Sequence, residues 1–157
     1  MEESVSLLNK ILETFELDKQ NPKQYSPLVL AYIGDTVYDL IIKTVIISLG
    51  NASVNRLHQK ASKIVKAQAQ AALIMSMEEE LTEEEHGIFK RGRNAKSFTS
   101  AKNASITDYR TATGMEALLG YLYLTGQMDR ALELVRRGLD KSGQLETLFA
   151  PIVHKCD

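Results

Sequence analysis

The stretch that decides the fold is Pro27–Leu49, PLVLAYIGDTVYDLIIKTVIISL, in a chain of 157 residues. Serine is a favoured N-cap residue and proline suits the first helical position, so Ser26 and Pro27 predict that a long helix begins here. Gly50 predicts its end. Apolar residues lie on nearly every side of this helix, and a helix that is apolar all round is a central, buried one.

A single polar stripe runs along this helix, with Asp35, Asp39 and Lys43 spaced four residues apart. These charges argue against a membrane span. Asp39 and Lys43 can form an i,i+4 ion pair, with Asp35 at the edge of the protein. Alternatively, Asp35 is buried, and a buried carboxylate is costly unless it is paired, hydrogen-bonded or bound to a metal. Periodicity alone does not decide between the two.

The chain holds only 3 Pro and 9 Gly, and helix-forming residues dominate the segments between them. Thr82 and Glu85 form a capping-box pattern at the start of one helix. Further helices are predicted at Glu2–Leu17, about Ser53–Met77, from Thr82 to near Gly92, about Asp108–Leu124, at Asp129–Lys141 and at Leu145–Val153. Residues 93–107 lack periodicity and are predicted to form a basic, polar loop. We expect an all-α fold, a compact single-domain bundle of about six to seven helices over residues 1–157.

The net charge of −1 averages two basic segments and an acidic block. Residues 51–77 contain four Lys and Arg residues and no acid, and residues 78–85 contain six Glu residues and no base. Residues 86–110 contain six Lys and Arg residues against Asp108 alone. A local anion-binding surface is therefore compatible with the low net charge, and helix-start chemistry explains the glutamates.

Two groups of residues are candidates for contact with nucleic-acid phosphates. One follows a polar stripe on the predicted third helix, a stripe that ends at Gln70, and the other follows the acidic block. The residues are Arg56, Lys60, Lys63 and Lys66 on the helix, and Arg91, Arg93, Asn94 and Lys96 in the second segment. Arg56 and Lys66 lie about 15 Å apart along a helix, which can meet several phosphates of a duplex. The alternative is an ordinary solvated face.

Glu116 stands alone among apolar and small residues in the segment Thr113–Gly120. Gly114 and Gly120 cost helix stability and are better explained by the close approach of a second helix. Glu116 is either a satisfied core residue or, together with Asp35, part of a site for a hard cation. Mg²⁺ is bound by one or two carboxylates, with water and substrate phosphate as the other ligands.

Cysteine and histidine usage excludes other classes of site. Cys156 is the only cysteine, which argues against disulfide and cysteine–zinc frameworks and favours a cytoplasmic location. The 3 His lie far apart in the sequence, so a zinc site is not expected. No Gly-rich phosphate loop, nucleophile elbow or dinucleotide fingerprint is present. The first residues, 1–17, are acidic and amphipathic rather than typical of a signal peptide.

Two segments resemble the catalytic helices of the ribonuclease III superfamily. They are Leu30–Tyr38, LAYIGDTVY, and Thr113–Leu124, TGMEALLGYLYL. Between them lies Arg91–Lys96, RGRNAK. In this order the three motifs resemble in particular Mini-III ribonuclease, the short bacterial form, and the similarity covers about residues 25–138.

The resemblance implies an endonuclease domain that cleaves double-stranded RNA with Mg²⁺, which Mn²⁺ can replace. It also implies a role in maturing the precursor of large-subunit (23S) ribosomal RNA, with a ribosomal protein as a candidate for presenting the RNA. Asp35 matches the family's catalytic aspartate, and Glu116 matches its metal-binding glutamate. Full-length ribonuclease III has further carboxylates where Ala31 and Thr113 stand here, which leaves the number of metal ions open. No separate double-stranded-RNA-binding domain is expected after residue 140.

Two other functions compete with a metal-dependent ribonuclease. One is a non-catalytic ribosome-assembly factor that binds double-stranded RNA, and the other is a helical interaction protein. Asp35 and Glu116, in contexts that match the family, favour the ribonuclease. We also expect a homodimer, because the long second helix is too apolar for one domain to cover. No membrane association is expected, since charged residues interrupt this helix. Its candidate interface residues are Leu28, Val29, Tyr32 and Thr36.

Overall fold

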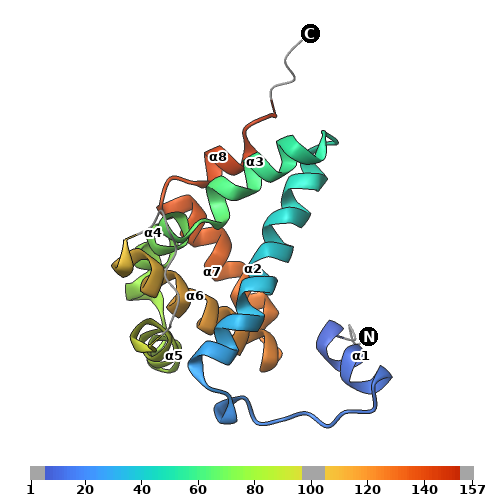
Figure 1. Ribbon diagram of the computed structural model, residues 1–157, viewed down its shortest axis with the longest axis vertical. Coiled ribbons are helices and arrows are strands. Elements are labelled where there is room, and N and C mark those ends of the chain that lie inside the picture. Colours follow the sequence, from blue (N-terminus) through green and yellow to red (C-terminus); the bar gives the residue numbers. More distant parts are fainter. Residues whose placement is uncertain (1–5, 97–104, 153–157) are drawn as a thin grey trace.

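Eight α-helices and two short 3-10 helices form the regular structure of residues 6–96 and 105–152, the parts of the chain that the computed structural model describes (Figure 1). The α-helices are α1 (Leu7–Thr14), α2 (Pro27–Leu49), α3 (Val54–Val65), α4 (Ala67–Met77), α5 (Glu83–Asn94), α6 (Ile106–Leu124), α7 (Met128–Lys141) and α8 (Leu145–Phe149), and the 3-10 helices are η1 (Pro22–Gln24) and η2 (Glu78–Glu80). The all-α prediction is confirmed, and its helix count was too low because the predicted third helix is two helices.

The central helix of the bundle is α6, which packs against α2, α4, α5 and α7. Every residue from Thr111 to Leu122 is buried except Glu116, which is half-buried. The helix begins at Ile106, two residues before the predicted start, because the Ser105 side chain accepts a hydrogen bond from the backbone N–H of Asp108. The long helix α2 has the predicted bounds and is also central. It is not buried all round, since its Tyr32 side chain is 80% exposed.

Glycines bring α2 and α6 into backbone contact. A Cβ atom on Gly34 would lie 1.7 Å from the carbonyl oxygen of Glu116, and one on Gly120 would lie 2.0 Å from the carbonyl oxygen of Leu30. Both separations are far below van der Waals contact, so no residue with a side chain fits at either place. The sequence-based expectation of a close helix crossing at Gly120 is confirmed, and the partner helix is α2.

A second glycine contact joins α5 to α6. A Cβ atom on Gly92 would lie 2.7 Å from Cβ of Ala117, and one on Gly114 would lie 2.7 Å from the carbonyl oxygen of Phe89. We predicted that this helix frays near Gly92, and that prediction is wrong: α5 continues to Asn94. Gly92 is a packing residue here rather than a helix stop.

The predicted single helix over 53–77 is interrupted at Lys66, whose backbone is extended (φ −64°, ψ 154°). Side chains satisfy the last carbonyl groups of α3. The Tyr38 hydroxyl donates to the Ile64 carbonyl at 3.1 Å, and the Gln70 amide donates to the Val65 carbonyl at 2.8 Å. These hydrogen bonds replace those that a continuous helix would make, and they turn α4 away from α3.

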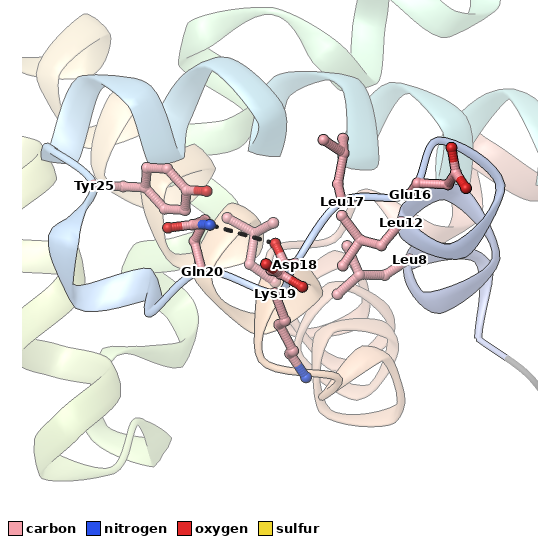
Figure 2. A pocket seen from close by; sticks show the side chains of 9 residues that line it. Leu8, Leu12, Glu16, Leu17, Asp18, Lys19, Gln20 and Tyr25 are labelled. Carbon is pink, nitrogen blue, oxygen red and sulfur yellow. Dashed lines mark hydrogen bonds between the residues drawn. The ribbon is translucent and has the colours of Figure 1, made fainter.

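The remaining helices are close to their predicted places. α7 matches the predicted bounds to within one residue, and α8 ends at Phe149 rather than Val153. α1 confirms the central part of the predicted first helix, while residues 1–5 lie outside the described residues. Figure 2 shows how α1 packs: Leu8 and Leu12 line a pocket of about 380 Å³ together with Leu17 and Tyr25.

No helix within 6–96 or 105–152 combines the length and the apolar content that crossing a bilayer requires. The long helix α2 is the most apolar candidate by sequence, and its charged residues break the apolar run.

We predict that Gly34→Ala and Gly120→Ala each lower the free energy of unfolding by about 3 kcal/mol or more, because the added methyl group forces α2 and α6 apart. Gly87→Ala is the matched control. It lies in α5 and its Cβ would meet only the Arg91 guanidinium, at 3.7 Å, so the change should stabilise the protein by about 0.5 to 1 kcal/mol. Urea denaturation measures all three. Wild-type stability in both crossing variants would contradict this account of the crossing.

Candidate active site

The crossing of α2 and α6 brings Asp35 and Glu116 together. Asp35 directly follows Gly34 on α2, and the carbonyl group of Glu116 is the one that Gly34 approaches. The two carboxyl groups are hydrogen-bonded to each other. Asp35 is exposed, while Glu116 is half-buried. The pairing that the sequence predicted for these residues is therefore present.

Glu116 holds a proton that a surface carboxyl group would lose. Burial raises its pKa to about 9, and the hydrogen bond with Asp35 and the negative charge of Asp35 act in the same direction. At neutral pH Glu116 is therefore protonated, and it donates the hydrogen bond that joins it to Asp35. A group that binds both carboxylates must displace this proton.

The two neighbouring positions at which the full-length family has carboxylates are uncharged here. Ala31 is buried on α2. Thr113 is 9% exposed on α6, and its hydroxyl donates to the Tyr109 carbonyl at 3.0 Å. Over residues 6–96 and 105–152, no three His, Cys, Asp or Glu side chains gather in a metal-binding group. Asp35 and Glu116 thus form a two-carboxylate site.

Both parts of the alternative interpretation of the α2 stripe are present, because Asp39 and Lys43 are paired and Asp35 is exposed. Asp39 and Lys43 form the expected ion pair, with 2.8 Å between Oδ2 and Nζ. Both side chains are largely exposed, so this pair adds little stability. Asp35 does not merely mark the edge of the protein, because its carboxyl group contacts Glu116.

The basic residues predicted on the third helix divide between α3 and the break after it. Lys63 and Lys66 are exposed, whereas Arg56 and Lys60 are half-buried. The Lys60 ammonium donates to the carbonyl oxygen of Ala150, and partial burial together with the charge of Lys63 lowers its pKa. Gln70, which we placed on the polar stripe, is 4% exposed and belongs to the interior. The stripe is therefore shorter than predicted, because the chain turns at Lys66.

The second basic segment is helical up to Asn94, and α5 directs its two arginines to different sides. The Arg93 guanidinium lies 5.4 Å from the centre of the buried Phe89 ring, a cation–π contact. Arg91 lies in a pocket with Lys23 on another face, since residues two apart on a helix do not share a face. Asn94 and Lys96 are exposed at the end of the helix. Residues 97–104, which include the rest of the predicted loop, lie outside the described residues.

The acidic block forms the predicted capping box, and it also ties α5 to α7. Thr82 and Glu85 exchange both capping hydrogen bonds. Two nitrogens of the Arg130 guanidinium donate to the Glu85 carboxylate, each at 2.9 Å, which lowers the pKa of Glu85. The preceding residue, Glu84, accepts a hydrogen bond from the Tyr121 hydroxyl. Sequence reasoning found the cap and missed both tertiary partners, which come from α7 and α6.

The comparisons with known proteins agree with this geometry. A model of the ribonuclease III domain matches residues 28–127, which include both carboxylates. A mini-ribonuclease 3 from Clostridium tetani is 54% identical over 122 residues, covering 77% of this chain and 81% of the relative. A mini-ribonuclease 3 from Enterococcus faecalis is 50% identical over 124 residues, covering 78% of this chain and 94% of the relative. The crystal structure of a Fusobacterium nucleatum protein superimposes with a TM-score of 0.68 at 26% identity, covering 74% of this chain and 93% of that one.

The raised pKa of Glu116 predicts how the stability of the metal-free protein depends on pH. Its ordinary value is near 4.5 and its value in the folded protein is about 9, so between these pH values the folded state binds more protons than the unfolded state. The free energy of unfolding therefore falls as the pH rises through this window. Glu116→Gln, which stays neutral, should remove this contribution and be more stable than the wild type at pH 8.

Denaturation in the presence of a chelator, at several pH values from 5 to 9, measures this effect. Glu79→Gln, which changes an exposed carboxylate, is the control and should keep the wild-type pH dependence. A Glu116→Gln variant with the same pH dependence as the wild type would show that Glu116 is not held protonated.

Proposed function

Because the chain belongs to the ribonuclease III family and is an endoribonuclease, we propose that it cleaves double-stranded RNA at Asp35 and Glu116 with a bound divalent cation. The observation that carries the proposal is the hydrogen-bonded pair of carboxyl groups at the crossing of α2 and α6. Burial and the neighbouring Asp35 raise the pKa of Glu116 to about 9, so its ionised form is unfavourable in the absence of a cation. A cation bound by both carboxylates stabilises that form.

The donor set fits a hard cation with few protein ligands. Asp35 and Glu116 supply carboxylate oxygens only, and Mg²⁺ is commonly held by one or two carboxylates while water and substrate phosphate complete its coordination. We therefore propose Mg²⁺, with Mn²⁺ as a substitute. When bound, such an ion polarises the phosphodiester and lowers the pKa of a bound water.

Each carboxyl group then has a distinct part. Asp35 is exposed, so it is the carboxyl group on the side of the site from which the phosphate approaches. Glu116 lies deeper and must release its proton before it acts as a ligand. The rigid glycine crossing holds both oxygens in place, which limits the reorganisation that binding requires.

Two basic surfaces are proposed to bind the phosphates of the duplex. The residues are Arg56, Lys60, Lys63 and Lys66 around α3, and Arg91, Arg93, Asn94 and Lys96 on and after α5. Phosphate contacts position a nucleic acid without reading its sequence. A-form RNA presents a wide minor groove with 2′-hydroxyl groups, so shape and 2′-hydroxyl contacts should distinguish it from DNA.

The proposed substrate is a double-stranded stem in the precursor of large-subunit (23S) ribosomal RNA, as the family resemblance implies. A ribosomal protein that presents this stem is a further proposed partner. Such a substrate would place the enzyme in the cytoplasm.

The exposed face of α2 supports a proposed homodimer. Its Leu28, Val29 and Tyr32 side chains are 38%, 47% and 80% exposed, and Thr36 is exposed beside them. A two-fold axis through this face would bury these side chains against their copies. It would also give two Asp35–Glu116 sites for the two strands of a duplex, whose strands are related by local two-fold axes.

We predict that Asp35→Asn and Glu116→Gln each reduce duplex cleavage by about 100-fold or more, because loss of even the outer partners of a metal ligand costs about 10- to 100-fold. Both changes keep the shape of the side chain, so circular dichroism and duplex binding should remain close to wild type. Asp140→Asn, an exposed change on α7, is the control. Cleavage of a labelled RNA duplex across a range of Mg²⁺ and Mn²⁺ concentrations is the measurement. Near-normal rates in both variants would refute the assignment, and duplex binding without cleavage by the wild type would favour the assembly-factor alternative.

The dimer proposal predicts a specific product from mixed chains. When wild-type chains are combined with an excess of Asp35→Asn chains, heterodimers should cut one strand of a long duplex and leave the other intact. Nicked products on native and denaturing gels report this outcome. Tyr32→Glu should shift the protein to monomers in light scattering and reduce double-strand cleavage. A fully active monomer, with no nicked product from mixtures, would exclude the dimer.

A further inference from the structure

A small pocket lies between η1, the start of α2 and the second half of α5. Its volume is about 170 Å³. Its lining residues are Pro22, Lys23, Tyr25, Pro27, Leu30, Ile88 and Arg91. Two of these residues are cations, contributed by separate elements, and none is a carboxylate. The walls are otherwise apolar or aromatic, so the two positive charges determine the electrostatic character of the pocket.

Neither cation has an acidic partner among residues 6–96 and 105–152. The ion pairs found there involve other basic side chains, namely Lys43, His86, Arg130, Arg137 and Lys141. Lys23 and Arg91 form none of them. No carboxylate of the described residues therefore neutralises either cation by a direct ion pair.

The nearby glutamates are held by other groups. A wider cleft continues from this pocket and shares Lys23, Ile88 and Arg91 with it, and Glu84 and Glu85 line its far side. Glu84 accepts a hydrogen bond from the Tyr121 hydroxyl, and Glu85 is paired with Arg130. These contacts occupy the two carboxylates with other partners, and neither forms an ion pair with Lys23 or Arg91.

The pocket lies in line with the carboxylate pair. Pro27, Ala31 and Asp35 are spaced four residues apart on α2 and so follow one side of the helix. Pro27 lines the pocket, and Asp35 lies eight residues farther along, which is about 12 Å at roughly 1.5 Å per residue. Neighbouring phosphates of one strand lie closer together than this, so a phosphate in the pocket and a phosphate at Asp35 would belong to different nucleotides.

We propose that Lys23 and Arg91 form a subsite that binds one phosphate group of the RNA backbone, on a different nucleotide from the phosphate that lies at Asp35. This subsite rests on the proposed cleavage of duplex RNA. The pocket, with a volume of about 170 Å³, has room for a phosphate group. The guanidinium supplies forked donors and the ammonium supplies a point charge. Lys23 lies before residues 28–127, the part that the family model matches, so the subsite adds a contact from outside that region.

The salt dependence of binding tests the subsite. Affinity for an RNA duplex is measured without divalent cations at several salt concentrations, for Lys23→Gln and Arg91→Gln. Each change should weaken binding about 3- to 10-fold at 0.15 M salt and lower the slope of log K against log salt by roughly 0.7 to 0.9, equally for duplexes of different sequence. Arg91→Lys, which keeps the charge, should retain most of the slope.

Matched controls separate a local contact from a general loss of charge. Lys19→Gln removes a charge from the same connector at a residue that lines the α1 pocket instead (Figure 2). Arg136→Gln removes an exposed arginine on α7. Both should keep the wild-type slope. Circular dichroism and thermal unfolding confirm that each variant is folded.

The outcomes also separate this proposal from the proposed function. If the wild type binds and cuts the duplex while Lys23→Gln and Arg91→Gln keep its salt slope, the subsite is wrong and the nuclease assignment stands. If both variants lose affinity no more than Lys19→Gln and Arg136→Gln do, the effect is general charge and the subsite is wrong as well. If the wild type does not bind the duplex at all, both proposals fail.

Discussion

Direct backbone contact between α2 and α6 at Gly34 and Gly120 is the constraint on which the rest of the structure depends. Each glycine in a helix costs about 0.5 to 1 kcal/mol relative to alanine, and the chain carries both at the point where the long helices α2 and α6 meet. The backbone contact at these two glycines fixes the separation of the α2 and α6 axes. Because the carbonyl group that Gly34 contacts belongs to Glu116, this separation also sets how near Asp35 and Glu116 lie.

The consequence is an electrostatically unfavourable site inside a well-packed bundle. Glu116 sits on the most thoroughly buried helix, and burial beside Asp35 raises its pKa to about 9. A helix with leucine at that position would give a more stable protein without the acidic pair. Functional sites commonly keep such unfavourable groups at some cost in stability. The glycine contact of α5 with α6, at Gly92 and Gly114, supports the same helix from its other side.

The parts of the fold set by local chemistry were predictable from sequence. The Ser26–Pro27 start of α2, the Thr82–Glu85 capping box and the Asp39–Lys43 ion pair each depend on residues at most four apart, and the structure has all three. The break at Lys66 was not predictable in this way. It depends on the Tyr38 hydroxyl, which reaches α3 from α2, and on a Gln70 side chain that turns inward.

The candidate site was predictable in its residues and not in its surroundings. Isolated carboxylates on apolar helices, next to glycines and within family-like motifs, indicated Asp35 and Glu116. Periodicity gave no signal for Lys23, which lies in an irregular connector and meets Arg91 only through the tertiary fold. It also grouped Arg91 with Arg93, although α5 extends far enough to place them on different faces. Glycine at position 92 was interpreted as a helix stop because its packing partner, Ala117, lies in another helix.

Anomalous X-ray diffraction from crystals soaked in Mn²⁺ tests the central claim most directly, namely that the α2–α6 crossing builds a cation site from Asp35 and Glu116. The account predicts a bound Mn²⁺ ion between the two carboxyl groups of the wild type, and none there in crystals of Glu116→Gln treated in the same way. Mn²⁺ bound elsewhere on the protein, with Asp35 and Glu116 still hydrogen-bonded to each other, would contradict it.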